Sequence, residues 1–271
     1  MKNAFLKILI LIGLCSVITF NSVSLLLEKN NQAANVSSVD ISSLYSTHDV
    51  KDIEKQIKSI SDQRKQEAEE EKLAAERLSS YENLMNQLDN GVITYRQLFS
   101  DTYIVGDSLM HGLNMYHILD SSKMITMVSA SLYHLDDNIG NIIAANPERL
   151  VLHYGINNLI NSESGLNSFI TMYERILKNL KASLPDTEIY VSSIFSVSPS
   201  VAYQFPWIDR YNSALFELIS EIGVNFVDNS ECLPADGSYY GSDGIHVTKD
   251  FYTQVWLPHL FYSINMNQEK S

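Results

Sequence analysis

A serine at the end of an apolar segment is the first residue of this 271-residue chain whose position suggests chemistry. Ser108 follows residues 102–105, a short apolar run typical of a buried strand, and precedes a segment of helical pattern. Its hydroxyl would then lie exposed in the field of a helix N-terminus, where a serine can act as a nucleophile. A serine that only caps the helix fits the same position. Position alone leaves both interpretations open.

A histidine and an aspartate near the other end of the chain favour catalysis. Asp243 precedes His246 by three residues in a loop rich in Gly and Ser. At this spacing the carboxylate can accept a hydrogen bond from imidazole Nδ1, which leaves Nε2 free to take a proton from a serine. A loop histidine beside a capping aspartate is the simpler alternative. Combined with Ser108, the pair predicts a Ser-His-Asp triad.

An asparagine pair follows the apolar run at residues 149–153. Asn157 and Asn158 come directly after Gly155 and Ile156. A side-chain amide at a strand end can donate a hydrogen bond to an oxygen that becomes negative in a tetrahedral intermediate. Gly and Asn are also common in turns, so the segment has a structural interpretation as well.

These three segments together resemble the SGNH/GDSL hydrolase family over about residues 100 to 263. Residues 106–109, Gly-Asp-Ser-Leu, match the nucleophile block of that family, and residues 243–246 match its last block, D-x-x-H. Residues 155–158 match the block G-x-N-D, except that Asn158 stands where Asp is usual. The resemblance implies that Ser108 attacks an ester carbonyl, His246 acts as base and then acid, and Asp243 orients His246.

The resemblance also implies an oxyanion hole and no metal or cofactor. Its donors would be the backbone N–H of Ser108, the side chain of Asn157 and a backbone N–H after the second strand. The family has glycine at that last position, and Ser129 replaces it here. Four other histidines lack a carboxylate or cysteine at ligand spacing and are interpreted as structural or surface residues: His111, His117, His134 and His153.

Aromatic residues cluster in two segments that should lie near the same edge of the sheet. They could form a wall for a sugar or another substrate, or they could only pack the loops. The candidate substrate-binding residues are Tyr203, Phe205, Trp207 and Tyr240.

The elements that must position these residues alternate between short apolar runs and amphipathic helical patterns. This alternation predicts an α/β fold, a three-layer α/β/α domain over residues 95–265 with a central five-stranded parallel sheet. The resemblance implies the flavodoxin-like SGNH version of that fold. We expect strands at 102–105, 124–128, 149–153, 188–192 and 224–227, and helices at 109–119, 135–145, 166–184, 207–222 and 248–264.

The N-terminal region has a different composition. Residues 8–27 are almost entirely apolar, and Lys2 and Lys7 lie before or at the start of this run. A run of roughly 20 such residues suits an uncleaved transmembrane helix, and a cleaved signal peptide is the alternative. We therefore predict a cytoplasmic tip and anchor at 1–28, a linker at 29–50 and a short tail at 266–271. The domain would then lie outside the membrane, or be secreted if the segment is cleaved.

Residues 51–90 contain neither Gly nor Pro, and Glu, Lys, Gln and Ala are frequent among them. Apolar residues recur at alternating steps of four and three positions, as on the contact face of a coiled coil, but the positions in the middle of this face are polar. The pattern fits an interrupted coiled coil, which would give a homo-oligomer, or a solvated single helix that serves as a stalk.

Composition limits the classes of function. The formal net charge of −13 argues against nucleic acid, because phosphate binding needs clustered cations. Cys15 and Cys232 are the two cysteines, so the domain itself cannot form a disulfide. We expect a serine esterase of the cell envelope that removes acyl groups, most plausibly acetyl, from a surface glycan or peptidoglycan. An O-acyltransferase with the same triad and a non-catalytic glycan-binding scaffold are the alternatives.

Overall fold

The computed structural model describes residues 50–266 and divides the chain into two units, residues 1–71 and 72–271. The predicted anchor, nearly all of the predicted linker and the last five residues lie outside the described range. No helix within residues 50–266 combines the length and the apolar character that crossing a membrane requires.

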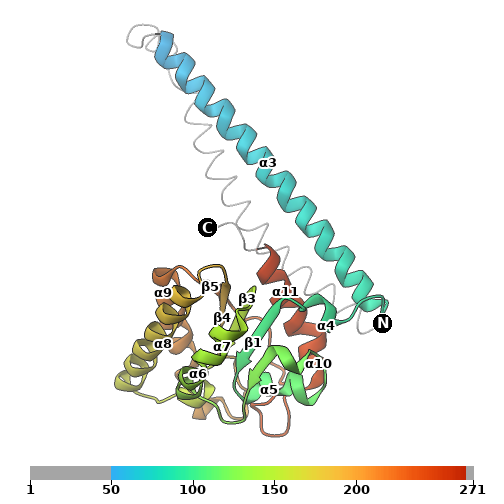
Figure 1. Cartoon of the computed structure of the whole chain (residues 1–271), viewed down its shortest axis with the longest axis vertical. Helices are drawn as coiled ribbons and strands as arrows, with labels where there is room; N and C mark the ends of the chain where they lie inside the picture. Colours follow the sequence, from blue (N-terminus) through green and yellow to red (C-terminus); the bar gives the residue numbers. More distant parts are fainter. Residues whose placement is uncertain (1–49, 267–271) are drawn as a thin grey trace. The chain divides into compact units, whose positions relative to one another are not determined.

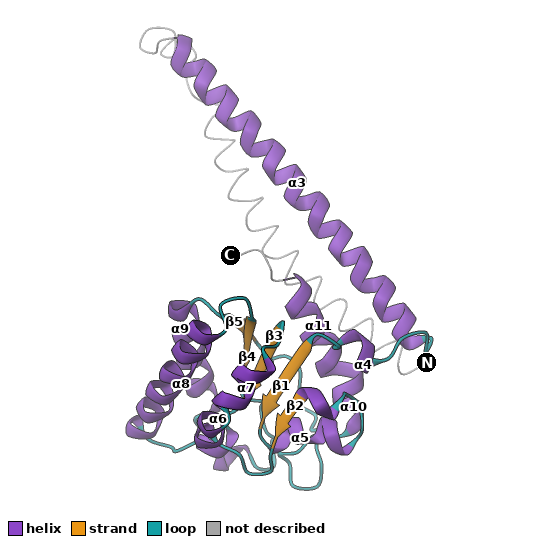
Figure 2. Cartoon of the chain, in the orientation of Figure 1, coloured by secondary structure: helices purple, strands orange, loops and turns teal. Residues whose placement is uncertain are grey.

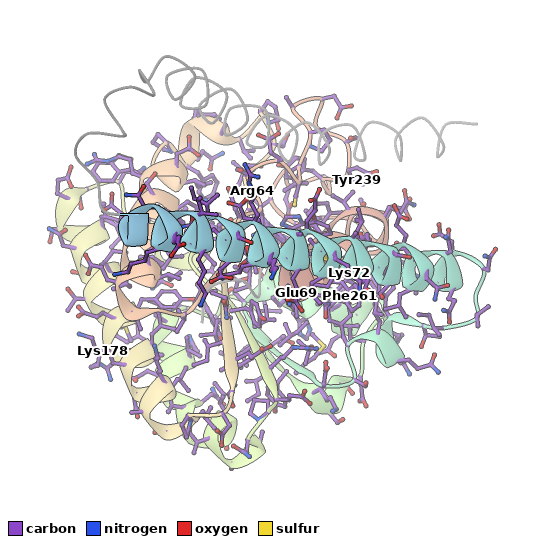
Figure 3. All side chains as sticks on the ribbon, turned by 90° about the horizontal axis from the view of Figure 1, so that it is seen from above. Arg64, Glu69, Lys72, Lys178, Tyr239 and Phe261 are labelled. Carbon is purple, nitrogen blue, oxygen red and sulfur yellow. The ribbon has the colours of Figure 1, made fainter. Side chains whose placement is uncertain are left out.

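Helix α3 (Val50–Asp89) is one continuous helix of 40 residues. No Gly or Pro interrupts it, and pairs four residues apart such as Lys72–Glu76 connect its exposed surface. At 1.5 Å per residue its length is about 60 Å. Figure 3 shows charged side chains, among them Arg64 and Glu69, standing away from its ribbon. Self-association through this helix stays a prediction.

The last turns of α3 pack against the C-terminal helix α11 (Leu257–Met266) within the second unit. The Tyr81 ring stacks on Phe261 with centroids 6.1 Å apart and meets the edge of Tyr262 at 5.3 Å. Its hydroxyl donates to the Pro258 carbonyl at 3.4 Å. The partly buried Tyr81 ring thus makes the last turns of α3 a packed part of the second unit. The function of the helix as a stalk stays a prediction.

A five-stranded parallel sheet forms the centre of the second unit, as predicted, in the order β2-β1-β3-β4-β5. The order is that of flavodoxin-like folds. Most strand residues are buried because helices cover both faces. The strands are β1 (Thr102–Gly106), β2 (Met124–Thr126), β3 (Arg149–His153), β4 (Glu188–Ser192) and β5 (Asn225–Val227).

The helices lie on the two faces that right-handed crossovers require. In Figures 1 and 2, one set covers one side of the sheet and the other set covers the opposite side. The first set is α6 (Leu132–Asp137), α7 (Ile139–Ala145), α8 (Glu163–Ser183) and α9 (Ile208–Ile222). The second set is α5 (Ser108–Met115), α10 (Lys249–Phe251) and α11, and the short α4 (Tyr95–Leu98) lies next to this set.

Three elements differ from the sequence prediction for local reasons. Helix α5 ends at Met115, four residues early, because His117 adopts a left-handed conformation with φ 55°. The helix expected at 135–145 is two helices that meet at Asn138. The last helix contains a π-helical segment at Tyr252–Trp256, just before Pro258, which has no N–H to continue the regular α-helical pattern.

Strand β2 is also shorter than predicted, since it ends at Thr126 and not at residue 128. Met127 and Val128 leave the sheet and are 43% and 61% exposed. This early exit frees residues 127–131 to form a loop at the carboxyl edge of the sheet, where parallel α/β folds place their functional groups.

Substitutions at two helical glycines should change the free energy of unfolding in opposite directions if this packing is correct. A Cβ at Gly112 in α5 would overlap the buried Tyr252 ring, so Gly112→Ala should lower the free energy of unfolding by about 1–3 kcal/mol. A Cβ at Gly140 in α7 meets nothing within 4 Å, so Gly140→Ala should raise it by about 0.5 kcal/mol. Urea denaturation of both variants measures the difference, and equal effects would contradict the packing of α5 on Tyr252.

Candidate active site

Ser108 lies at the junction between β1 and α5, as the sequence predicts. Asp107 caps the helix by accepting the Leu109 N–H at 2.9 Å, which makes Ser108 the first helical residue. Gly106 allows the strand to approach closely, because a Cβ there would overlap Met110 and the His153 carbonyl oxygen. The partly buried Ser108 side chain therefore projects from the carboxyl edge of the sheet at a helix N-terminus.

Asp243 and His246 lie in a tight loop whose shape comes from its own hydrogen bonds. Asp243 Oδ1 accepts the N–H groups of Ile245 and His246 at 3.0 and 2.9 Å. Gly244 takes φ 70°, a left-handed conformation that glycine adopts without strain. An antiparallel bridge between Tyr240 and Val247 closes the base of the loop.

A chain of two hydrogen bonds connects these residues across 138 positions of sequence. His246 Nδ1 lies 2.6 Å from Asp243 Oδ2, and His246 Nε2 lies 3.0 Å from Ser108 Oγ. Because the carboxylate holds the hydrogen on Nδ1, the lone pair of Nε2 faces the serine hydroxyl. The arrangement can remove the proton of Ser108 as its oxygen attacks an electrophile.

The charge of Asp243 persists over the whole range in which enzymes work. Its partial burial raises the pKa, but the hydrogen bonds from His246 and from the Ile245 N–H lower it more, to about 2. The Asp243 carboxylate is therefore ionised at neutral pH.

The segments that contain two of the predicted oxyanion donors, Asn157 and Ser129, are joined by a hydrogen bond. Asn157 Nδ2 donates one hydrogen to the Ala130 carbonyl at 2.9 Å, which fixes the orientation of the amide and leaves its second hydrogen for another acceptor. Ser129, the neighbour of Ala130, has φ 59°. A residue with a Cβ thus occupies the left-handed conformation in which a glycine was expected, and its backbone N–H is retained.

Asn158 does not face the reaction centre. Its Oδ1 accepts the Leu132 N–H at 3.1 Å, in the first turn of α6. An aspartate would provide the same acceptor, so the replacement conserves this contact. The departure from the expected G-x-N-D block affects the support of the loop and leaves the donor Asn157 in place.

Asp107 has an electrostatic role that the sequence analysis did not consider. Its side chain is fully buried, and Oδ2 finds no hydrogen-bond partner among the described residues. Burial raises its pKa to about 7, although the Leu109 N–H and the nearby His246 act in the opposite direction. A capping carboxyl that directly follows a buried strand is the sequence signal that could have identified it.

The aromatic candidates have different surroundings. Tyr203 is 77% exposed, and its hydroxyl accepts a hydrogen bond from Gln204. Trp207 and Phe205 pack against the core, and the Arg210 guanidinium lies 4.0 Å from the centre of the Trp207 ring. Tyr240 is half-buried, and its hydroxyl donates to the carbonyl of Ser196 at 3.1 Å. Tyr240, like Phe205 and Trp207, is partly buried against the core, so Tyr203 is the most exposed of the four candidates.

The other histidines have individual partners. His153 is fully buried, which lowers its pKa to about 3, and its Nδ1 lies 3.0 Å from Ser192 Oγ. His111 Nδ1 lies 3.2 Å from Thr126 Oγ1. Within residues 50–266, no three His, Cys, Asp or Glu side chains lie close enough together to hold a metal ion.

Comparison with known proteins gives one family match. Residues 104–254 match the sequence model of the GDSL-like Lipase/Acylhydrolase family, which is more than half of the chain. No curated protein matches the sequence.

Several solved structures resemble the chain at low identity. A GDSL-like lipase from Bacteroides thetaiotaomicron is 12% identical, with a TM-score of 0.46 over 69% of this chain and 95% of the other. A lipase/acylhydrolase from Enterococcus faecalis is 10% identical, with a TM-score of 0.48 over 63% and 98%. An acetyl xylan esterase from Geobacillus stearothermophilus is 12% identical, with a TM-score of 0.44 over 63% and 94%.

The raised pKa of Asp107 predicts a pH-dependent stability. Its folded value of about 7 exceeds the unfolded value of about 4, so the folded chain binds more protons between these limits. The stability that this group contributes is therefore lost as pH rises from about 4 to 7. Asp107→Asn keeps an acceptor for the Leu109 N–H and cannot ionise.

We expect the stability of Asp107→Asn relative to the wild type to increase by about 2–3 kcal/mol between about pH 5 and pH 8. Urea denaturation at both pH values measures this change. A relative stability that does not change with pH would show that the carboxyl titrates at an ordinary pKa.

The left-handed Ser129 gives a second prediction. Ser129→Gly should raise the free energy of unfolding by about 0.5–1 kcal/mol, because glycine adopts φ 59° without steric cost, and it should conserve activity because the N–H is retained. Ser220→Gly, in the exposed surface of α9, should instead lower the stability by about 0.5 kcal/mol. Thermal unfolding of both variants tests the pair, and a destabilised Ser129→Gly would refute the assigned backbone conformation.

Proposed function

The chain belongs to the GDSL-like lipase/acylhydrolase family and is a serine hydrolase of acyl esters, and we propose that Ser108, His246 and Asp243 are its catalytic triad. The observation that carries the proposal is the uninterrupted chain of hydrogen bonds from Asp243 Oδ2 through the imidazole of His246 to Ser108 Oγ. The Asp243 carboxylate is hydrogen-bonded to His246 Nδ1, and His246 Nε2 faces the Ser108 hydroxyl, which is the arrangement that a general base and a serine nucleophile require.

In the proposed reaction, Ser108 Oγ forms a bond to the acyl carbon while His246 Nε2 takes its proton. His246 then gives that proton to the departing alcohol oxygen, which leaves an acyl-serine. Water attacks the acyl-serine with His246 again as base, and the carboxylic acid and free Ser108 are released. Asp243 keeps the Nδ1 hydrogen throughout and stabilises the imidazolium in each step.

We propose the backbone N–H groups of Ser108 and Ser129 and the side chain of Asn157 as the oxyanion hole. The Ser108 N–H belongs to the first turn of α5, where backbone N–H groups have no partner within the helix. The second hydrogen of the Asn157 amide is available for the substrate, since the first is held by Ala130. Three donors fixed before substrate arrives lower the barrier more than donors that must reorganise.

The exposure of the site supports a small acyl group on a large substrate. The side chains of His246 and Asp243 are 49% and 48% exposed, so the alcohol side of the ester need not enter an enclosed cavity. An acetyl group needs little enclosure, and the exposed Tyr203 could stack on a sugar ring. We therefore propose an acetylated glycan of the cell envelope, or peptidoglycan, as the substrate.

The location belongs to the same proposal. An apolar segment at residues 8–27 would anchor the chain in the cytoplasmic membrane and place the hydrolase outside. Helix α3 would then separate the domain from the bilayer. A polymer-bound ester outside the cell is the kind of substrate that an anchored enzyme with an open site can reach.

Hydrolysis of para-nitrophenyl acetate by the full chain tests the triad. Ser108→Ala should lower kcat by about 10⁴-fold or more, because no other nucleophile takes its place. Asp243→Asn should lower kcat by about 10⁴-fold, because an amide favours the wrong tautomer of His246. Ser168→Ala, an exposed serine on α8, is the control and should leave kcat unchanged.

Two results would contradict the proposal. Turnover that persists in Ser108→Ala would exclude Ser108 as nucleophile. No turnover by a folded wild-type chain, on aryl acetate or on acetylated glycan, would favour an acyltransferase or a binding protein over the hydrolase.

A further inference from the structure

The loop at residues 127–131 must hold one oxyanion donor, yet little of it is buried. Met127 and Val128 are exposed, and only Ala130 reaches the core. Ser129 between them has a left-handed backbone, which costs about 1–2 kcal/mol for a residue with a Cβ. Apolar burial alone does not explain why this loop keeps its conformation, so its polar contacts must contribute.

Three hydrogen bonds hold the C-terminal side of this loop. The Ala130 carbonyl accepts from Asn157 Nδ2 at 2.9 Å, and the Leu132 N–H donates to Asn158 Oδ1 at 3.1 Å. Between these two, the Ser131 N–H donates to Nδ1 of His134 at 3.1 Å. The first two bonds come from the segment after β3, whereas the third comes from the loop's own following helix.

His134 occupies the third position of α6, where Glu or Gln often accepts the N–H of the capping residue. Here an imidazole has that task. Since the Ser131 backbone can only donate, Nδ1 must present its lone pair, and the hydrogen of the neutral ring must sit on Nε2. The contact is therefore specific for one tautomer of His134.

We propose that His134 is a positioning residue of the oxyanion hole. The Ser131 N–H and the Ala130 carbonyl belong to the same peptide unit, so by holding this N–H His134 fixes the carbonyl that orients the Asn157 amide. It also limits the movement of Ser129, the residue before Ala130, and thereby the direction of the Ser129 N–H. This inference rests on the proposed function, because it assigns Ser129 and Asn157 to the oxyanion hole. His134 itself touches no reacting atom.

Loss of the His134 contact should weaken stabilisation of the transition state and leave binding of the ground-state ester unchanged. Oxyanion donors act at about 2.7–3.1 Å, and a displacement of about 1 Å can cost a factor of about 100 in rate. A ground-state ester makes little use of these donors. When the loop loosens, kcat and kcat/KM should therefore fall by the same factor.

The test compares His134→Gln with His134→Leu in the full chain, with para-nitrophenyl acetate as substrate. Gln provides an acceptor for the Ser131 N–H, and Leu has a similar size and helix propensity but no acceptor. His134→Leu should lower kcat and kcat/KM together by about ten-fold or more, while His134→Gln should stay within about three-fold of the wild type. Asp137→Ala, at the exposed end of the same helix, is the control and should have no effect.

Each result decides the inference separately from the proposed function. An active wild type with equal rates for the Gln and Leu variants would overturn the role of His134 and leave the triad intact. An inactive wild type would overturn the triad itself. If the Leu variant does not fold, ¹⁵N NMR of the wild-type imidazole decides: a hydrogen on Nε2 of His134 supports the inference, and a hydrogen on Nδ1 overturns it.

Discussion

One hydrogen bond, between Ser108 Oγ and His246 Nε2, depends on nearly the whole second unit. Its two residues are 138 positions apart, one at the end of the first strand and one just before the last helix. The parallel sheet collects the ends of its strands at one edge, and this brings the two side chains within 3.0 Å. Helix α5, which begins at Ser108, packs closely against Tyr252 in the π-helical segment that follows the loop of His246.

The site concentrates local conformational and electrostatic costs that the rest of the fold must offset. Asp107 buries a carboxyl with one oxygen that finds no partner among the described residues, and Ser129 has a backbone conformation that suits glycine. Asp107 directly precedes Ser108, and Ser129 lies in the loop that follows β2. Such costs persist only where the surrounding structure holds the residue firmly, and they are common at functional sites. The close packing between the sheet and its two helical layers supplies that support.

Hydrogen bonds connect four loops at the carboxyl edge of the sheet in series. Asn157 contacts Ala130, Asn161 contacts the Gln204 carbonyl at 3.5 Å, and Ser198 contacts the Gly244 carbonyl at 2.8 Å. The loops after β2, β3 and β4 and the loop of His246 are thus connected pair by pair. These contacts hold the loops to one another, while the side chains of His246 and Asp243 stay about half exposed.

The sequence was sufficient to predict the parallel α/β fold, because strands and helices leave different periodicities, and it predicted a triad of Ser108, Asp243 and His246 from their spacing and their resemblance to a family. Strands at 149–153 and 188–192 were predicted to the residue. The early end of β2 and the left-handed Ser129 were not predictable, because both depend on how the loop after β2 meets segments that are distant in sequence. The burial of Asp107 and the hydrogen bond between the Ser131 N–H and His134 depend on the tertiary structure, which decides whether a polar group is buried and which backbone group it meets.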